Sequence, residues 1–347
     1  MKLTVHLITW NGAKYVPHLF ASLRQQTFKD WMLLVVDNHS EDGMVEKMKN
    51  ELNNFSFPYK LIENHTNLGF APGHNQAYQN TDGEYFLLLN QDMYLEPDCL
   101  EKMVKFLDTH PEAAAVSPRL MRWNFGLVAS GEPLEKSFTN QIDALGLKVF
   151  RNRRVIERET QEEWNKDKYG DKDYEEVFGV SGAFPMYRRS AIKAVEFSDH
   201  TFLDETYHSY KEDVDLSFRL RERGFRSFVI FNTVAFHDRA GAGPKDMLDT
   251  AAAENKKQQS AWVRYHSYKN HLRTLYKNEY WQNFLLDFPW IFWYELKKLV
   301  WYILFDRKVL KGLGEVFKNR KDLFKKHLAI KQARTVSWRD LRKWWIN

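Results

Sequence analysis

The feature that most constrains the fold is an alternation of strand-like and helix-like segments over the first 120 residues of the sequence. Apolar runs at 31–37 (WMLLVVD) and 84–90 (EYFLLLN) alternate with amphipathic stretches at 42–54 and 97–110. Short apolar runs bounded by polar residues indicate strands that are buried on both faces. Because strands that alternate with helices favour a mostly parallel sheet flanked by helices, the sequence predicts an α/β fold.

Polar and small residues follow four of these predicted strands at the point where each strand ends. The four stretches are ITWNG (8–12), VVDNHSEDG (35–43), ENHTNLGFAPGHNQA (63–77) and LLLNQDMYL (87–95). Open α/β sheets bind ligands at the carboxyl ends of their strands, so we expect one crevice there. For the fourth strand alone, a capped strand end before a turn is an equally good interpretation. None of the stretches has the spacing of a dinucleotide or Walker phosphate loop.

The rest of the chain divides into a first domain, residues 1–243, and a C-terminal region, residues 244–347. Residues 151–176 are almost wholly charged or polar, which predicts a solvated, mobile loop, with a lid over a substrate as the alternative. A predicted helix at 212–224 and a predicted strand at 227–236 complete the first domain. The C-terminal region is helical in pattern.

The C-terminal region also differs from the first domain in charge and in tryptophan content. From residue 294 to the end there are 15 Lys and Arg against 5 Asp and Glu, a net charge of +10 in a chain of net charge +5. Eight of the 12 Trp lie beyond residue 260, and one helical stripe comprises Phe292, Leu296, Leu299 and Ile303. No uncharged apolar run reaches the roughly 18 residues of a spanning helix. We expect this stretch to bind a membrane surface, with ordinary packing on the first domain as the alternative.

Other features bear on where the protein works and on what it binds. Cys99 is the one cysteine, which excludes an internal disulfide and a cysteine-based zinc site and is consistent with a reducing compartment. The N-terminal stretch MKLTVHLITWNG is typical of a first strand rather than of a signal peptide. The basic tail lacks a nucleic-acid motif, so we expect no nucleic-acid partner. The expected location is cytoplasmic, peripheral on the inner face of the plasma membrane.

The order and spacing of the four motifs resemble those of the inverting family 2 glycosyltransferases, which have a GT-A nucleotide-sugar fold. The resemblance covers residues 1 to about 243. NLGFAPGHNQA (67–77) and FHDRAGAG (236–243) are similar to the rhamnosyltransferase-type enzymes of bacterial cell-envelope polysaccharides. The resemblance implies transfer of a sugar from a nucleoside-diphosphate donor to a glycan or lipid-linked oligosaccharide. It favours dTDP-rhamnose as the donor, with UDP-hexoses next.

The resemblance also implies which residues bind the donor nucleotide. Asp37 would accept the imide N–H of a uracil or thymine ring, and the alternative is that it caps the following helix. Glycine permits close approach of the backbone to ribose and base, although the segment 69–71 can also be a plain tight turn. The other donor-nucleotide contacts implied by the resemblance are Thr9, Asn11, Gly69, Phe70, Ala71, Asn90 and Gln91.

The stretch 90–92 (NQD) occupies the place of the Asp-x-Asp motif of the family. The resemblance implies that Asp92 binds Mg²⁺ or Mn²⁺, which in turn holds the diphosphate of the donor. The sequence departs from the family pattern at Asn90, and the loss of one carboxylate weakens the site electrostatically. The resemblance implies His237 as a second metal ligand, with a structural role as the alternative for a lone histidine near a strand end.

Three carboxylates stand within four residues at the start of the predicted helix at 212–224. The resemblance makes Asp213 the general base, and Glu212 would position the base or the acceptor. We expect Asp213 to stay ionised because the helix dipole favours an anion at the helix N-terminus. Asp215 and Arg219, four residues apart, are expected to pair. The resemblance places two further residues along the donor-sugar or acceptor cleft, Gly182 and Ala183.

Two other functions stay open from the sequence. A sugar nucleotidyltransferase on a related fold would also use a metal, but TWNGAKYVPH (9–18) is a poor match to the Gly-rich loop typical of that class. A non-catalytic, membrane-associated polysaccharide-assembly protein would keep the fold without turnover. Asn90 is compatible with this second alternative, whereas the intact EDVD (212–215) and His237 argue against it.

Overall fold

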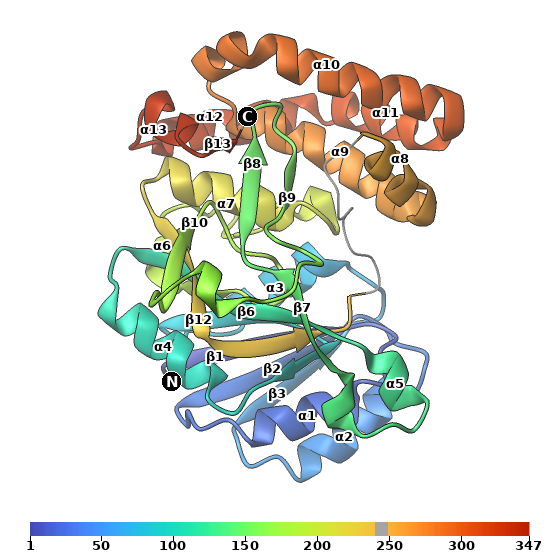
Figure 1. The fold of residues 1–347 in the computed structure, drawn as a ribbon, viewed down its shortest axis with the longest axis vertical. Helices are drawn as coiled ribbons and strands as arrows, with labels where there is room; N and C mark the ends of the chain where they lie inside the picture. Colours follow the sequence, from blue (N-terminus) through green and yellow to red (C-terminus); the bar gives the residue numbers. More distant parts are fainter. Residues whose placement is uncertain (240–248, 347) are drawn as a thin grey trace.

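The computed structural model describes residues 1–239 and 249–346 and confirms the predicted alternation of strands and helices (Figure 1). The first strands are β1 (Leu3–Thr9), β2 (Trp31–Asp37), β3 (Tyr59–Glu63) and β4 (Tyr85–Asn90), and the helices between them are α1 (Val16–Arg24), α2 (Met44–Asn53) and α3 (Phe70–Gln79). β1 pairs in parallel with β2 and β4, and β2 pairs in parallel with β3. The carboxyl ends of all four strands therefore lie at one edge of the sheet, as predicted.

The sheet continues beyond β4 through strands from later in the chain. β11 (Met186–Arg188) is antiparallel and lies between β4 and β6 (Ala113–Trp123), and β12 (Arg226–His237) pairs in parallel with β6. The strand order is β10-β12-β6-β11-β4-β1-β2-β3. The strands at its margins are β10 (Tyr174–Val177), β5 (Met93–Leu95), which pairs with β12, and β7 (Phe138–Ala144), which pairs with β6. This arrangement confirms the predicted mostly parallel sheet.

Helices cover both faces of the sheet and bury its central strands (Figure 1). The remaining helices of this part are α4 (Cys99–Thr109), α5 (Phe125–Ala129), α6 (Arg189–Lys193) and α7 (Glu212–Glu222). In β4, Leu87 and Leu89 face one core cluster, whereas Phe86 and Leu88 face the other. Complete burial of one such side chain contributes about 1.5–3 kcal/mol. Burial on both faces is why β4 is a continuous apolar run that ends in polar residues only at the sheet edge.

Residues 151–176 are more structured than the predicted solvated loop. β8 (Leu147–Phe150) and β9 (Val155–Glu157) form a hairpin, and β8 also pairs with β13 (Trp345–Ile346). Arg153 is buried, and its guanidinium lies 2.5 Å from Glu279 and 3.1 Å from Asp287. These partners are more than 120 residues away along the chain, so the local sequence does not reveal that the charges are paired. Movement of this segment over a substrate stays a prediction.

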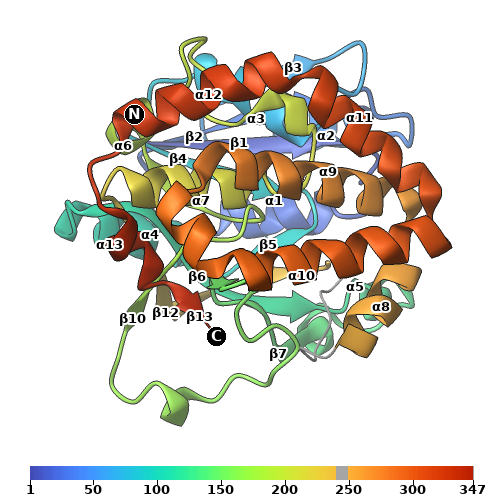
Figure 2. The ribbon, with the colours of Figure 1, turned by 90° about the horizontal axis from the view of Figure 1, so that it is seen from above.

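The C-terminal region packs on the α/β part through α9, and the predicted boundary at 243/244 lies outside the described residues. Its helices are α8 (Asp249–Gln258), α9 (Ala261–Asn278), α10 (Trp281–Phe305), α11 (Lys311–Lys318), α12 (Arg320–Ala333) and α13 (Trp338–Arg342). α9 lies between α10 and α12 in the view from above (Figure 2). Its Lys277 Nζ lies 2.6 Å from Asp204 Oδ2 and 2.9 Å from Asp215 Oδ1. The region is therefore joined to the α/β part by buried ion pairs.

Helix α10 buries polar side chains and exposes apolar ones, the reverse of an amphipathic helix on the surface of a water-soluble protein. Its buried residues include Asn283, Asp287 and Lys298. Five large apolar side chains on this helix are between 59% and 67% exposed, namely Trp281, Leu285, Trp293, Leu304 and Phe305. Of the predicted stripe, Phe292 and Ile303 are exposed, whereas Leu296 and Leu299 are half-buried. Among residues 1–239 and 249–346, no helix combines the length and the apolarity that crossing a bilayer requires.

Candidate functional site

The nucleotide side of the predicted crevice is centred on Asp37, the buried last residue of β2. Asp37 Oδ1 accepts hydrogen bonds from Thr9 Oγ1 at 2.9 Å and from Ser40 Oγ at 2.6 Å. Its Oδ2 accepts one from the Ser40 amide at 2.9 Å. The carboxylate thus joins the ends of β1 and β2 and caps the turn that follows. Asp37 does not cap the following helix, because the N-cap of α2 is Gly43 and no side chain caps that helix, so the capping alternative is wrong. The contact with a nucleobase stays a prediction.

Gln91 ties the end of β4 to the end of β1. Its Oε1 accepts a hydrogen bond from the Trp10 amide, and its Nε2 donates one to the Trp10 carbonyl, both at 2.9 Å. A Cβ atom on Gly12 would come within 2.4 Å of this side chain. Asn11 Oδ1 accepts a hydrogen bond from the Glu41 amide at 2.8 Å. Gln91 and Asn11 therefore shape the crevice through contacts within the protein, and their contacts with a nucleotide stay predictions.

The segment from Gly69 to Ala71 lies against the loop that leads to α7. Gly69 has φ of +93°, and a Cβ atom there would lie 2.7 Å from the ring of His208. Ala71 donates its amide hydrogen to the His208 carbonyl at 3.1 Å, and Phe70 donates to Ser209 Oγ at 3.4 Å. Glycine is required here both by backbone conformation and by space. The predicted donor segment is therefore in contact with the loop that carries the predicted base.

The predicted metal ligands are brought together by the sheet. β5 pairs with β12 so that Met93 lies opposite His237, and this places Asp92 beside the imidazole. Asp92 Oδ1 and His237 Nε2 are 3.4 Å apart. The other ring nitrogen, Nδ1, lies 2.9 Å from Oδ2 of the buried Asp143 on β7. Burial opposes the imidazolium, but the carboxylates of Asp92 and Asp143 outweigh it and raise the pKa of His237 to about 9.

The geometry of Asp92 and His237 fits a shared divalent ion. Ligand distances of about 2.1 Å place neighbouring ligands of one ion about 3 Å apart, close to the separation of these two atoms. Asp143 fixes the imidazole so that Nε2 faces Asp92 and could bind an ion held between them, as carboxylates behind metal-bound histidines do. Among the described residues, no group of three His, Cys, Asp or Glu side chains is arranged to hold a metal. The remaining ligands would be diphosphate oxygens and water, which is usual for Mg²⁺.

Asp143 is the residue that the sequence analysis missed at this centre. It belongs to the stretch IDALGLKV (142–149), in which it is the one acidic residue among mainly apolar ones. A carboxylate within an apolar stretch is expected to be buried and therefore paired with another group. Because that partner can be structural or functional, the stretch is only a weak signal of a functional residue. The pairing with His237 spans 94 residues and depends on the register of β6, β7 and β12.

The predicted base, Asp213, is held at the start of α7 by two backbone amides. Its Oδ2 accepts a hydrogen bond from the Gly182 amide at 3.0 Å, and its Oδ1 accepts one from the Val214 amide at 2.8 Å. Burial and the charge of Glu157 raise the pKa of Asp213, although Lys211 and the amides oppose the rise. The helix dipole alone predicted the opposite direction, and burial among carboxylates overrides it. A raised pKa makes the ionised carboxylate a stronger base.

Glu212 is buried directly beside this base. Its Oε2 has no hydrogen-bond partner within the part of the chain that the structure describes. Burial and the neighbouring Asp213 raise the pKa of Glu212 to about 8, because two adjacent carboxylates do not both ionise readily. Glu212 therefore holds a proton at neutral pH. The predicted pair of Asp215 and Arg219 is confirmed, with Oδ2 and Nε 3.0 Å apart.

Two consecutive residues connect the metal side of the crevice to the base. The Ala183 carbonyl accepts a hydrogen bond from the Asn90 amide at 3.2 Å, and the amide of the preceding Gly182 binds Asp213. A Cβ atom on Gly182 would lie 3.3 Å from the Cβ of Asp213, which leaves little room for a larger residue. The structure thus places the predicted cleft residues Gly182 and Ala183 between the predicted metal motif and the predicted base.

Arg239 forms a second connection, which the sequence analysis did not single out although it lies within FHDRAGAG. Its Nη1 lies 2.6 Å from Glu157 Oε1, and its Nε lies 3.1 Å from Asp143 Oδ1. Asp143 supports the predicted metal ligand His237, and Glu157 raises the pKa of the predicted base Asp213. The guanidinium therefore lies between the two halves of the crevice.

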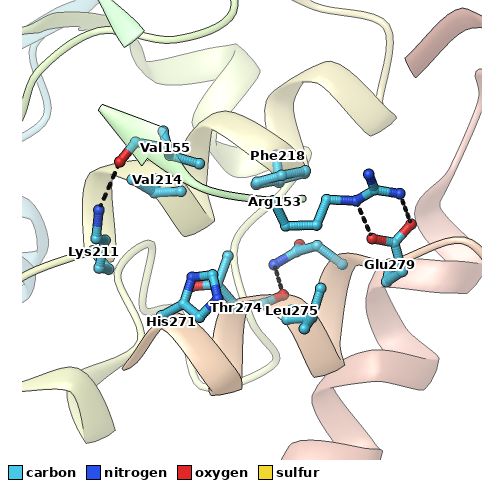
Figure 3. A pocket seen from close by; sticks show the side chains of 10 residues that line it. Arg153, Val155, Lys211, Val214, Phe218, His271, Thr274, Leu275 and Glu279 are labelled. Atoms are coloured by element: carbon cyan, nitrogen blue, oxygen red, sulfur yellow. Dashed lines mark hydrogen bonds and ion pairs between the residues drawn. The ribbon is translucent and has the colours of Figure 1, made fainter. Parts of the chain in front are cut away.

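A small cavity beside the base belongs to the packing of α7 rather than to the crevice (Figure 3). Its volume of about 20 Å³ has room for one water molecule and not for a sugar. Lys211 Nζ donates a hydrogen bond to the Val155 carbonyl at 3.1 Å at one end of the cavity. The lining residues are Arg153, Val155, Lys211, Val214, Phe218, His271, Thr274, Leu275, Asn278 and Glu279. The cavity marks where β9, α7 and α9 meet.

The amino-acid sequence is similar to a family of known enzymes and to several of its curated members. The family model described as glycosyl transferase family 2 matches residues 4–196. The chain is 29% identical over 109 residues to an uncharacterized glycosyltransferase of Haemophilus influenzae, covering 31% of this chain and 35% of that protein. It is 34% identical over 117 residues to the poly(ribitol-phosphate) β-N-acetylglucosaminyltransferase TarS of Staphylococcus aureus, covering 32% of this chain and 19% of that protein. The matches thus span between 19% and 35% of the length of these two relatives.

A longer but weaker similarity links the chain to a rhamnosyltransferase. The chain is 22% identical over 274 residues to the N-acetylglucosaminyl-diphospho-decaprenol L-rhamnosyltransferase of Mycobacterium tuberculosis, covering 73% of this chain and 81% of that protein. This alignment includes most of the α/β part, whereas the two shorter ones cover about a third of the chain.

Two solved structures share the fold of the chain. GalNAc-T7 with UDP, GalNAc and Mn²⁺ superposes with a TM-score of 0.59 at 12% identity, over 80% of this chain and 48% of the other. The mannosyltransferase PcManGT of Pyrobaculum calidifontis with GDP-Man and Mn²⁺ superposes with a TM-score of 0.51 at 14% identity, over 96% of this chain and 85% of the other. At these identities the likeness shows the fold alone, and it confirms the predicted GT-A arrangement.

Proposed function

Because the chain belongs to the family 2 glycosyltransferases, we propose that it transfers a sugar, with inversion, from a nucleoside-diphosphate donor to a hydroxyl group of a glycan or lipid-linked oligosaccharide. The observation that carries the proposal is the position of Gly182 and Ala183. They bind Asp213 on one side and the Asn90 end of β4 on the other. The predicted base Asp213 thus borders the same crevice as the Asp92–His237 pair.

The proposed reaction assigns separate tasks to the two sides of the crevice. On one side, Asp213 removes the proton from the acceptor hydroxyl as that oxygen attacks the anomeric carbon, a contribution of about 10²–10⁴ in rate. Glu212, protonated at neutral pH, donates a hydrogen bond to the acceptor or positions it. On the other side, Asp92 and His237 would hold Mg²⁺ or Mn²⁺, which supplies charge stabilisation to the departing diphosphate. Asn90 supplies no second carboxylate there.

The donor that we propose is dTDP-rhamnose, with UDP-hexoses next. The motifs NLGFAPGHNQA and FHDRAGAG and the similarity to the mycobacterial rhamnosyltransferase support a deoxyhexose donor. We propose that Asp37 reads the imide of a thymine or uracil base from its place at the end of β2. The name of the same relative supports a lipid-diphosphate-linked N-acetylglucosamine as the acceptor.

Nucleotide release tests the proposal directly. Wild-type protein should release dTDP or UDP from one of these donors in the presence of Mn²⁺, and Asp92→Ala or Asp213→Ala should reduce transfer at least about 100-fold. Asp82→Ala, at an exposed carboxylate that precedes β4 and so lies at the opposite end of that strand from Asn90, is the matched control and should keep full activity. Circular dichroism checks that each variant is folded. Wild-type activity in a folded Asp213→Ala variant would remove the assigned base.

We propose that the exposed apolar face of α10 attaches the enzyme to a membrane surface. On this helix Asn283, Asp287 and Lys298 are buried, whereas most of the large apolar side chains are exposed, which is the polarity of a helix lying in a lipid interface. Exposed Arg307, Lys308 and Lys311 follow its C-terminal end and are suited to anionic head groups. Attachment there would bring the crevice to lipid-linked acceptors.

Vesicle sedimentation tests the membrane proposal independently of catalysis. The protein should sediment with vesicles that contain phosphatidylglycerol and less with vesicles of pure phosphatidylcholine. The triple change Leu285→Ser, Trp293→Ser and Leu304→Ser should abolish binding, whereas Tyr59→Ser, an exposed aromatic residue on β3, should not. Equal sedimentation of the triple variant would show that this face does not bind the membrane.

A further inference from the structure

Two exposed aromatic side chains stand together where the loop before α7 meets α9. Tyr210 is 41% exposed and Trp262 is 47% exposed. Their ring centroids are 5.6 Å apart and their planes are inclined at 69°. Tyr210 precedes Asp213 by three residues, whereas Trp262 belongs to the first turn of α9. The pair therefore joins the loop of the base to the C-terminal region.

The loop that carries Tyr210 is held in an unfavourable backbone conformation. His208, Tyr210 and Lys211 have φ angles of +63°, +72° and +71°, a region that residues with a Cβ seldom occupy. Such conformations persist only where the surroundings enforce them, and they cluster at functional sites.

The enforcing contacts come from α9, the same helix that carries Trp262. The buried side chain of Asn270 donates hydrogen bonds to the carbonyl oxygens of Tyr207, Ser209 and Tyr210 at 3.0, 2.9 and 2.8 Å. Helix α9 thus fixes the loop and supplies the second ring of the pair. A binding surface that is already fixed loses less conformational freedom when a ligand binds.

The pair also borders both halves of the crevice. The loop contacts the predicted donor segment through the hydrogen bond from the Ala71 amide to the His208 carbonyl. Burial and the charge of Glu212 raise the pKa of Tyr210, whereas Arg239 lowers it, so both groups act on its hydroxyl. The loop of Tyr210 thus contacts the predicted donor segment and leads directly to Glu212 and the predicted base.

We propose that Tyr210 and Trp262 form the acceptor subsite, in which one pyranose ring of the acceptor glycan packs its C–H face on the aromatic surface. The electron-rich face of an aromatic ring attracts the weakly positive C–H groups of a sugar. The exposed fraction of each ring leaves part of it open to a ligand. Within residues 1–239 and 249–346 the Tyr210 hydroxyl has no hydrogen-bond partner, so it can bind a sugar hydroxyl. The inference rests on the proposed transferase function, because only a transferase needs an acceptor beside its base.

Saturation-transfer NMR with octyl glycosides of N-acetylglucosamine, glucose and rhamnose tests the subsite in the full chain with UDP and Mn²⁺ present. At least one glycoside should receive saturation on its ring protons from the wild-type protein. Trp262→Ala and Tyr210→Ala should each weaken its binding by about five- to tenfold. Tyr276→Ala is the matched control, because Tyr276 lies on the same helix and is 48% exposed.

Three results would overturn the subsite. They are the absence of binding by every glycoside, unchanged binding in both aromatic variants, and saturation confined to the octyl chain, which would indicate a lipid site instead. Thermal unfolding of each variant checks that the loop substitutions leave the protein folded. Failure of the proposed function gives a different result, because the wild-type protein would then release no nucleotide from any donor, whether or not a sugar ring binds at Tyr210 and Trp262.

Discussion

Lys277→Met should destabilise the whole protein, because Lys277 holds α9 against two buried carboxylates of the α/β part. Its Nζ lies 2.6 Å from Asp204 Oδ2 and 2.9 Å from Asp215 Oδ1, and all three side chains are fully buried. Removal of one partner from a buried ion pair costs about 3–5 kcal/mol. Each carboxylate keeps one other cation, Lys326 at 2.8 Å from Asp204 and Arg219 at 3.0 Å from Asp215. We therefore expect the lower limit, a loss of about 3 kcal/mol in the free energy of unfolding.

Urea unfolding followed by tryptophan fluorescence at several pH values measures this loss. Burial raises the pKa of Asp204, but Lys277 and Lys326 outweigh it and hold this pKa well below 3.8. A depressed folded-state pKa gives stability that is complete above the unfolded-state pKa of about 4 and is lost as the pH falls. The difference between wild type and Lys277→Met should therefore be largest near pH 7 and should narrow below pH 4. A loss under about 1 kcal/mol, or no more than in the exposed control Lys331→Met, would refute the argument.

Three further predictions concern the crevice. The folded-state pKa of Glu212 is raised to about 8, so its contribution to stability is lost as the pH rises from about 4.5 through about 8. The unfolding temperature should therefore fall between pH 5 and pH 9, and it should fall less in Glu212→Gln than in the wild-type protein. Asp143→Asn removes the charge behind His237 and should weaken Mn²⁺ binding about 10–100-fold by calorimetry with UDP present, and unchanged affinity would contradict a supporting role. Gly182→Ala forces Asp213 to shift and should lower kcat by roughly tenfold or more with the donor KM little changed, and a wild-type kcat would show that the base tolerates the shift.

The parts of the crevice that could be predicted from the sequence are those set by adjacent parallel strands. Thr9 and Asp37 end neighbouring strands, and their side chains form a hydrogen bond. Asp92 and His237 are 145 positions apart, yet each follows or ends a strand, and their contact was predicted from motif resemblance rather than from geometry. The ends of adjacent parallel strands converge whatever the exact register, which is why the contact of Thr9 with Asp37 was predictable from the strand pattern. Asp92 and His237 meet through the antiparallel pairing of β5 with β12, which the strand pattern does not specify.

The parts that could not be predicted depend on antiparallel pairing and on charges that meet over long distances. Asp143 reaches His237 only because β7 is antiparallel to β6, and nothing local to residues 138–144 specifies that register. The charged stretch 151–176 resembles a solvated loop, because the partners of Arg153 lie near residues 279 and 287. The pKa of Asp213 rises, since burial beside Glu157 outweighs the helix terminus. Each of these effects depends on charged or buried groups that are far apart in the sequence and that only the fold brings into contact.

The buried polar face of α10 determines that its apolar face is exposed. Asp287 lies 2.6 Å from Arg151, 3.1 Å from Arg153 and 2.7 Å from Arg342, so three guanidinium groups hold one side of the helix. Rotation of α10 to bury its aromatic residues would move Asp287 away from these three guanidinium groups. Arg153 would then stay buried without its contact to Asp287, a cost of several kcal/mol. Water-soluble monomers seldom expose apolar patches larger than a few hundred Å². An outward apolar face fixed by inward ion pairs is therefore typical of a surface that binds another apolar surface, and the basic residues at its end agree with the proposed attachment to an anionic lipid surface.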